Sequence, residues 1–155
     1  MGNKVDGKMV IEYIRKMIEG EFPHPRVADL IGFRLDSVDE GEAVISLEAK
    51  EHHFNPMGTL HGGIICDIAD SAMGMAFATT LKEGETYASV ELKMNFVRPF
   101  WTGKLLARAN VVTRGKVVGI VDCEVADEGG KLIARGSSTC MVLDGKRKEN
   151  RGIGG

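Results

Sequence analysis

The stretch from His52 to Asp70, HHFNPMGTLHGGIICDIAD, is a polar, glycine-rich loop that runs into a long apolar segment. Small and apolar residues continue on nearly every side at helical spacing, which predicts an enclosed helix over about 62–81. The free backbone N–H groups and positive dipole end at its start suit an anion or an oxyanion. Asp70, two turns further on, is costly to bury unless it is paired or used. The stretch therefore predicts a site that stabilises negative charge beside a base or nucleophile.

Local periodicity predicts one further helix and six strands around this segment. Residues 8–19 carry apolar positions at helical spacing, and Pro23 and Pro25 follow in a stiff connector. Residues 144–155 are polar and glycine-rich, which predicts a disordered tail. Turn residues suggest that the last four strands form a meander of hairpins. The strand-like runs lie at about 31–38, 42–50, 86–98, 102–114, 116–127 and 131–143.

This order of elements predicts an α+β fold with a single domain at 1–143. One antiparallel sheet of about six strands, wrapped around the long central helix, accounts for it with the fewest assumptions. Such a sheet leaves an exposed edge strand, and exposed edges favour pairing between copies of a chain. We therefore expect the protein to form a homo-oligomer.

The composition is typical of a soluble globular protein. Of the 155 residues, 43% are hydrophobic and 27% are charged, and the formal net charge is −2. This balance lacks the basic excess of proteins that bind nucleic acid. Three cysteines without a CxxC pair argue against a disulfide framework and favour a reducing, cytoplasmic location. The His and Cys spacing in the loop fits no common zinc pattern, and the acids within 62–81 argue against a membrane span.

The loop and the helical acid resemble the signature of acyl-CoA thioesterases of the phenylacetate-pathway type, which have the hotdog fold. That signature runs roughly H-x-N-x-x-G-x-x-H-G-G, with an acid nine residues after the last histidine. The chain matches it at His53, Asn55, Gly58, His61, Gly62, Gly63 and Asp70. The resemblance, which extends over about residues 10–143, implies hydrolysis of an arylacetyl or medium-chain acyl-CoA to the free acid and coenzyme A, without a cofactor. It also implies a homodimer, or a tetramer of two dimers, with the active site at the subunit interface.

The resemblance assigns roles to individual residues as well. The Gly62 backbone N–H would polarise the thioester carbonyl, and Asp70 of the partner subunit would act as general base or nucleophile. Asn55 would position the water or the acyl group, and His61 would orient the loop and the carbonyl. Ser89, on the strand after the helix, would assist the water.

The same resemblance implies the residues that would contact the substrate. Gly63 would line the site beside Gly62, and the acyl group would lie near four apolar side chains, those of Phe54, Met57, Met73 and Phe77. The basic hairpin tip Arg114-Gly115-Lys116 is either a solvated turn or a contact for the phosphates of coenzyme A.

Several of these residues have a structural alternative. Asn55 could serve only as a turn residue before Pro56, and His61 could cap the helix by satisfying its free amides. Asp67, one turn before Asp70, departs from the family pattern. It could tune the pKa of Asp70, point into solvent at an interface, or interact with the helix dipole.

Two other functions fit the same fold. A non-catalytic acyl-CoA sensor would keep the glycine loop but lack a working base, and the presence of both Asp70 and Asn55 argues against it. Hydratase chemistry on this fold would want a histidine a few residues after the acid. No histidine follows His61 in the chain.

Overall fold

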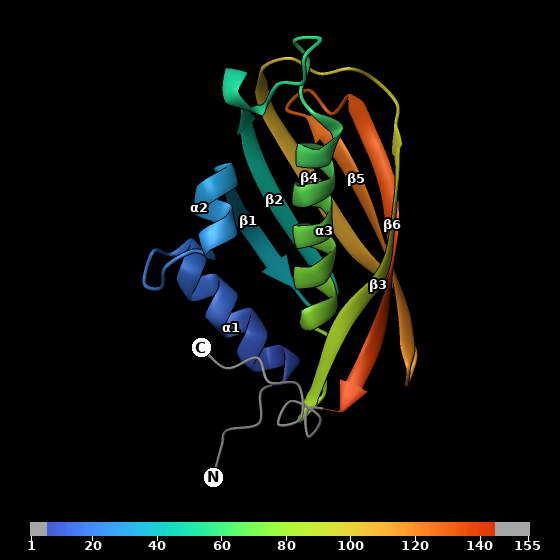
Figure 1. Cartoon of the computed structure of the whole chain (residues 1–155). Coiled ribbons are helices and arrows are strands. Elements are labelled where there is room, and N and C mark those ends of the chain that lie inside the picture. The colour runs from blue at the N-terminus through green and yellow to red at the C-terminus, as the bar shows by residue number, and fades with distance from the viewer. Residues whose placement is uncertain (1–5, 145–155) are drawn as a thin grey trace.

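One antiparallel sheet curves around a single long helix, α3 (Gly62–Ala78), in the computed structural model, which describes residues 6–144 (Figure 1). Two shorter helices pack against the first strand, at one edge of the sheet. The remaining elements are α1 (Gly7–Ile18), α2 (Arg26–Ile31), β1 (Phe33–Asp39), β2 (Glu42–Ala49), the 3₁₀ turn η1 (Glu51–His53), β3 (Glu85–Phe96), β4 (Gly103–Arg114), β5 (Val118–Asp127) and β6 (Leu132–Asp144). The expected α+β architecture with six strands and a central helix is confirmed.

The strand order is β1-β2-β4-β5-β6-β3, with every neighbouring pair antiparallel. β4, β5 and β6 form the expected hairpins, but the expectation that β3 joins the same meander is wrong. β3 pairs with β6 from Glu85 opposite Asp144 to Phe96 opposite Ala134, so it forms the far edge of the sheet. Turn residues reveal where a strand ends, but they do not reveal which strand lies beside it.

The helix boundaries differ from the expected ones for local reasons. α3 ends at Ala78 instead of 81, where the hydroxyls of Thr79 and Thr80 donate to the carbonyls of Ala76 and Phe77. These side-chain hydrogen bonds compete with continuation of the helix. α2 was not predicted, because six residues are too few for a helical period to show. The expected disordered tail falls on residues 145–155, outside the described part of the chain, whereas Asp144 ends β6.

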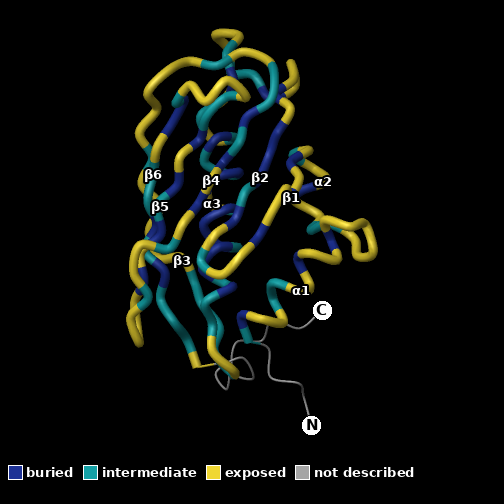
Figure 2. Tube along the Cα trace, turned by 180° about the vertical axis from the view of Figure 1, so that it is seen from behind, coloured by how far each residue is buried: buried dark blue, intermediate teal, exposed yellow. Residues whose placement is uncertain are grey.

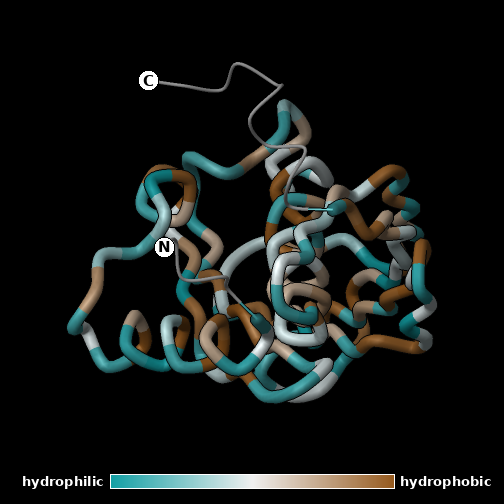
Figure 3. The backbone as a smooth tube through the Cα atoms, turned by 90° about the horizontal axis from the view of Figure 1, so that it is seen from below, coloured by the Kyte–Doolittle hydropathy of each residue, from teal (hydrophilic) through white to brown (hydrophobic). Residues whose placement is uncertain are grey.

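α1 has an amphipathic pattern, visible as alternating hydrophobic and hydrophilic stretches in Figure 3. Asp6 caps its start by accepting from the Met9 N–H at 3.0 Å. Ile14 and Met17 are buried, and the Gly7 N–H donates to the Leu81 carbonyl at 2.7 Å. α1 is thereby attached to the chain just after α3.

The core lies between α3 and the concave side of the sheet (Figure 2). Close approach depends on two glycines. A Cβ on Gly119 would lie 2.3 Å from the buried Phe77 ring, and one on Gly74 would lie 2.7 Å from the Tyr87 hydroxyl. The buried residues of α3 are Ile65, Ile68, Ala69, Ala72, Met73, Gly74, Ala76 and Phe77.

The expectation that α3 is enclosed on every side is wrong for a single chain. Gly63 and Asp70 are exposed, and no residue of the edge strand β3 is buried. The side of α3 near β3 is therefore only partly covered. None of the helices between residues 6 and 144 is long and apolar enough to cross a membrane.

Candidate active site

Asn55 holds the loop before α3 in a tight turn. Its backbone N–H donates to the Thr59 carbonyl at 2.8 Å, and its side-chain oxygen accepts from the N–H groups of Met57 and Thr59 at 2.9 and 3.2 Å. Its Nδ2 donates to the Thr59 hydroxyl at 2.8 Å. Gly58 takes the left-handed conformation that the turn requires, with φ of 78°. The turn role of Asn55 is thus present, and because an amide nitrogen carries two hydrogens, one remains available.

His53 anchors the loop to the rest of the fold. The ring is buried, its Nδ1 accepts from the Lys50 N–H at 3.1 Å, and its Nε2 lies 2.8 Å from the Ile31 carbonyl oxygen. A neutral ring with Nε2 protonated satisfies both contacts. The carbonyl of His53 also accepts from the His61 N–H at 2.9 Å. His53 therefore has a structural part in the loop signature.

His61 is the N-cap of α3. Its Nδ1 accepts from the Gly63 N–H at 2.8 Å, so the expected alternative, a capping histidine, is present in the structure. Accepting at Nδ1 leaves the proton of a neutral ring on Nε2. The Gly63 N–H is thereby occupied.

The Gly62 N–H is a free donor at the start of α3. Among residues 6–144 it has no acceptor, since the first residues of a helix have no partner within it and the His61 ring serves Gly63. The helix dipole adds positive potential at the same place. This N–H can therefore donate a hydrogen bond to a carbonyl oxygen or an oxyanion.

A cavity of about 290 Å³ opens beside this donor. The loop, the start of α3 and the segment after β3 form its walls. Its lining residues are Asn55, Thr59, Leu60, Gly62, Ile65, Phe96, Val97, Arg98, Pro99 and Phe100. The segment 96–100 was missed by sequence reasoning, because it lies 34 residues beyond Gly62 and no local pattern connects the two.

Asp70 lies two turns along α3, next to β3 and β6. It has no hydrogen bond or ion pair within the described residues. Although the residue as a whole is exposed in a single chain, neighbouring elements partly desolvate its carboxyl group, and this raises the pKa above the ordinary 3.8. Burial raises the pKa of Tyr87 to about 12, with smaller contributions from Cys140 and Asp70. Burial also raises the pKa of the Cys140 thiol. Hydrogen bonds with Ser138 and Ser89 lower this pKa in part, and the charge of Asp70 raises it further. Asp70 and Ser89 therefore share one neighbour, the Cys140 thiol.

Asp67 interacts with Asp70. Burial is the main cause of the raised pKa of Asp67, and the neighbouring charge of Asp70 raises it further. Asp67 is half-buried on the same side of α3, next to Cys66, whose thiol pKa is raised by burial and then by both acids. The raised pKa of Asp70 itself arises from burial alone, so the expectation that Asp67 tunes the pKa of Asp70 stays a prediction.

Gly62 and Asp70 lie too far apart to act on the same carbonyl within one chain. Eight residues separate them on α3, which at 1.5 Å per residue amounts to about 12 Å along the helix axis. We refer to the donor at the start of α3 and the carboxyl group beside β3 as the two candidate half-sites of one chain.

Four other predicted residues lie outside the cavity. Met73 and Phe77 have no exposed surface and pack in the core, so neither lines a space for an acyl group in this chain. Met57 is 85% exposed at the tip of the loop, and Phe54 is half-buried and pairs with Leu60 across the loop.

The two basic residues of the predicted hairpin tip lie in different surroundings. Arg114 is half-buried, pairs with Glu85, donates to the Gly115 carbonyl and lies 5.4 Å from the centre of the Phe77 ring. Its guanidinium therefore joins β3 to β4 near the C-terminal end of α3. Lys116 is exposed.

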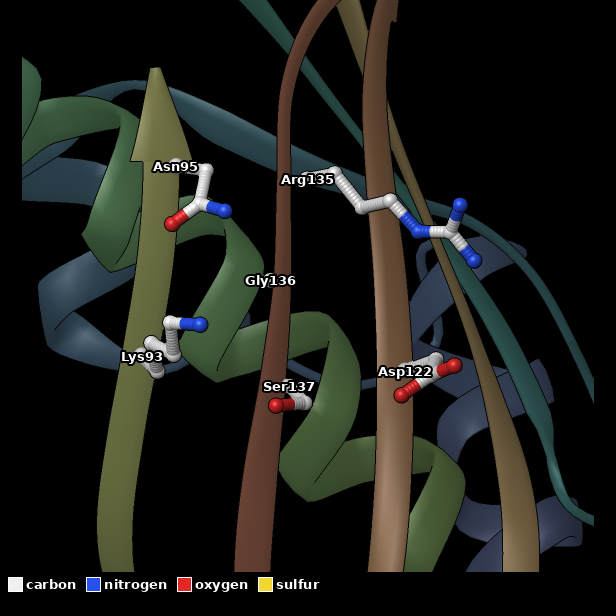
Figure 4. A pocket seen from close by; sticks show the side chains of 6 residues that line it. All are labelled: Lys93, Asn95, Asp122, Arg135, Gly136 and Ser137. Atoms are coloured by element: carbon white, nitrogen blue, oxygen red, sulfur yellow. The ribbon is translucent and has the colours of Figure 1, made fainter.

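A second, smaller cavity of about 160 Å³ lies on the outer face of the sheet, with α3 behind it (Figure 4). Its lining residues are Lys93, Asn95, Asp122, Arg135, Gly136 and Ser137. None of the predicted site residues lines it. The sheet separates it from Asp70.

Comparisons with known proteins agree in one respect, the kind of enzyme. The thioesterase superfamily model matches residues 57–134. Human acyl-coenzyme A thioesterase 13 is 30% identical over 107 residues, which cover 68% of this chain and 76% of the human protein. The 1,4-dihydroxy-2-naphthoyl-CoA hydrolase of Listeria monocytogenes is 28% identical over 121 residues, 78% of this chain and 97% of that protein. A phenylacetic acid degradation-related protein of Ralstonia eutropha has a similar solved structure, with a TM-score of 0.74, 33% identity, and coverage of 83% of this chain and 98% of that one.

Replacing His61 tests the helix cap. We expect His61→Ala to lower the free energy of unfolding by about 0.5–2 kcal/mol, because the Gly63 N–H loses its acceptor. Asparagine is a strong N-cap residue, so His61→Asn is the matched control and should retain most of the stability. Urea denaturation at one protein concentration measures both variants. Equal stability of the alanine variant and the wild type would contradict the capping role.

Proposed function

The chain belongs to the thioesterase superfamily and is a thioester hydrolase, and from this premise we propose that it hydrolyses an acyl-CoA ester to the free acid and coenzyme A. The family expected from the loop signature is thereby confirmed. The observation that carries the proposal is the Gly62 N–H at the start of α3, which has no acceptor in the described part of the chain and borders a cavity that Asn55 also lines.

The carbonyl oxygen of the thioester would accept a hydrogen bond from the Gly62 N–H. Negative charge develops on this oxygen when the carbonyl carbon is attacked, so a preorganised donor at a helix start stabilises the transition state more than the substrate. The remaining hydrogen on Asn55 Nδ2 is a second candidate donor from the same cavity. His61 would act indirectly, since its ring holds the first turn of α3 in place.

Asp70 would supply the base or the nucleophile. As a base it takes a proton from water, whose oxygen attacks the carbonyl carbon; the C–S bond then breaks and the thiolate of coenzyme A leaves and is protonated. As a nucleophile it attacks the carbonyl carbon directly, the C–S bond breaks, and the thiolate of coenzyme A leaves and is protonated; water then hydrolyses the mixed anhydride, which releases the free acid and restores the Asp70 carboxylate. Its raised pKa makes the carboxylate more basic than an exposed aspartate, which favours either role. Ser89 would orient the water through its hydroxyl.

Two copies of the chain would complete each site, because the half-sites of one chain are about 12 Å apart along α3. β3 is the surface that supports this pairing, since among the strands of residues 6–144 it bonds only to β6 and leaves its outer backbone edge open. Apolar side chains near this edge are exposed, namely Val90, Leu92, Phe96 and Val97. An open, apolar edge strand favours addition of another strand. We propose a homodimer built on β3, or a tetramer of two such dimers.

The acyl group would occupy the cavity at the start of α3. The aromatic side chains of Phe96 and Phe100 support an arylacetyl group, and a medium-chain acyl group also fits an apolar wall. Lys116 is the exposed cation of the hairpin tip for a phosphate of coenzyme A. The three free cysteines support a cytoplasmic location.

Replacing the acid tests the reaction. We expect wild-type protein to release thiol from one or more acyl-CoA esters in a panel, and Asp70→Asn to lower the rate about 10²–10⁴-fold, the usual contribution of a positioned acid–base group. The amide keeps the shape of the side chain and removes the base. Size-exclusion chromatography and circular dichroism show whether the variant keeps its fold and assembly. Tight acyl-CoA binding without turnover in either protein would instead indicate a sensor.

The pH profile of kcat/KM gives an independent test. Only the ionised carboxylate can act as base or nucleophile, so activity is lost as the pH falls through the pKa of Asp70. Burial disfavours the charged form and raises this pKa above 3.8, so the acid limb should lie at higher pH than for an exposed aspartate. An acid limb at or below 3.8 would show that another group controls the rate.

Mixing two inactive variants tests the shared site. Asp70→Asn removes the acid, and Gly62→Pro removes the backbone N–H at a position where proline suits a helix. If Asp70 acts across the dimer, each mixed dimer has one intact site, so joint refolding should restore about a quarter of wild-type activity.

Gly62→Ala is the matched control for this experiment, since it adds a side-chain carbon but keeps the N–H. The loss in the proline variant beyond the alanine variant measures the donor. If the two residues act within one chain, no mixed dimer has an intact site and the mixture stays inactive.

A further inference from the structure

The Phe96 ring packs on the α-carbon of Gly62, beside the proposed carbonyl donor. A Cβ built on Gly62 would lie 3.0 Å from Phe96 Cζ and 3.2 Å from Cε1. Both residues line the cavity at the start of α3, and Phe96 is nevertheless 54% exposed. The ring therefore covers Gly62 on one side and faces open space on the other.

This contact gives Gly62 a role that its backbone conformation does not explain. Gly62 has no positive φ, so the helix start itself would accept another residue. A side chain there would press against the Phe96 ring, because contacts near 3.0 Å are tighter than carbon atoms normally make. The glycine is thus needed for the close approach of the ring.

The Phe96 ring borders the cavity beside the donor. A carbonyl oxygen about 2.9 Å from the Gly62 nitrogen would place the acyl chain in the space that this ring borders. Other apolar residues that line the space of about 290 Å³ include Leu60, Ile65 and Phe100. A ring in this position leaves less room for a wide group next to the carbonyl than for a slim one.

We propose that Phe96 determines acyl specificity by limiting the width of the acyl chain at the carbon next to the thioester carbonyl. A methylene passes the ring, whereas a branched carbon or a directly attached aromatic ring collides with it. The preferred substrates are then straight-chain and arylacetyl esters, and α-branched and aroyl esters are poor ones. The proposal rests on the proposed role of Gly62 as the carbonyl donor.

Two pairs of CoA esters test it: butyryl against isobutyryl, and phenylacetyl against benzoyl. In wild type we expect kcat/KM to favour the methylene member of each pair by about 10–200-fold, the range for one misplaced methylene-sized group. Phe96→Ala and Phe96→Leu should each reduce both ratios, the alanine variant by about tenfold or more. Phe96→Leu keeps an apolar side chain on β3, so it separates ring width from loss of packing.

Val112→Ala is the matched control. Val112 is also an exposed apolar strand residue, at 56%, but it lies on β4, does not line the cavity and is not part of the proposed dimer edge. Its replacement should leave both ratios as in wild type.

The outcomes separate this inference from the proposed function. Wild-type ratios near one, or ratios that survive in active Phe96→Leu protein, would overturn the role of Phe96 and leave the thioesterase reaction standing. Failure of the wild type to hydrolyse any of the four esters, together with the rest of the acyl-CoA panel, would overturn the proposed function itself.

Discussion

Burial of one side of α3 against the curved sheet is the constraint on which the rest of the structure depends. Six residues of that side have no exposed surface, namely Ile68, Ala69, Ala72, Met73, Ala76 and Phe77. A large apolar side chain buried in this way contributes about 1.5–3 kcal/mol relative to an exposed one. Gly119 makes the packing possible, because any side chain there would overlap the Phe77 ring. A helix held so closely does not shift to suit a ligand, so the spacing between Gly62 and Asp70 is rigid.

That rigidity links the chemistry to assembly. The free N–H of Gly62 and the carboxyl of Asp70 stand on one rigid helix, too far apart to meet on one carbonyl. Both lie near β3, an edge strand of the sheet, since Gly62 approaches the Phe96 ring and the Asp70 charge acts on Tyr87. In the proposed dimer, a second chain adds to this edge, covers the exposed apolar residues and brings the complementary half-site. The same contact would then pair the open edge and complete the proposed site.

Much of the fold was predictable because the hydrophobic periodicity of a helix or strand is contained within its own short segment. The amphipathic stripe of α1, the apolar run of α3 and the alternation in the strands place these elements within a few residues of the observed ones. α2 was missed because it is shorter than two turns, and α3 ends early because Thr79 bonds back to the helix. The neighbour of β3 was mistaken, because pairing with β6 joins residues more than 35 positions apart and no local pattern encodes it.

The candidate site divides in the same way. The sequence by itself determined the tight turn at Asn55, the cap at His61, the free N–H of Gly62 and the acid two turns later, because capping, turn formation and the helix dipole act between residues a few positions apart. Only the tertiary structure decided that Met73 and Phe77 are core residues, that Arg114 pairs with Glu85, and that the Phe96 ring covers Gly62. Those outcomes depend on which distant surfaces exclude water together, and burial is a property of the whole fold.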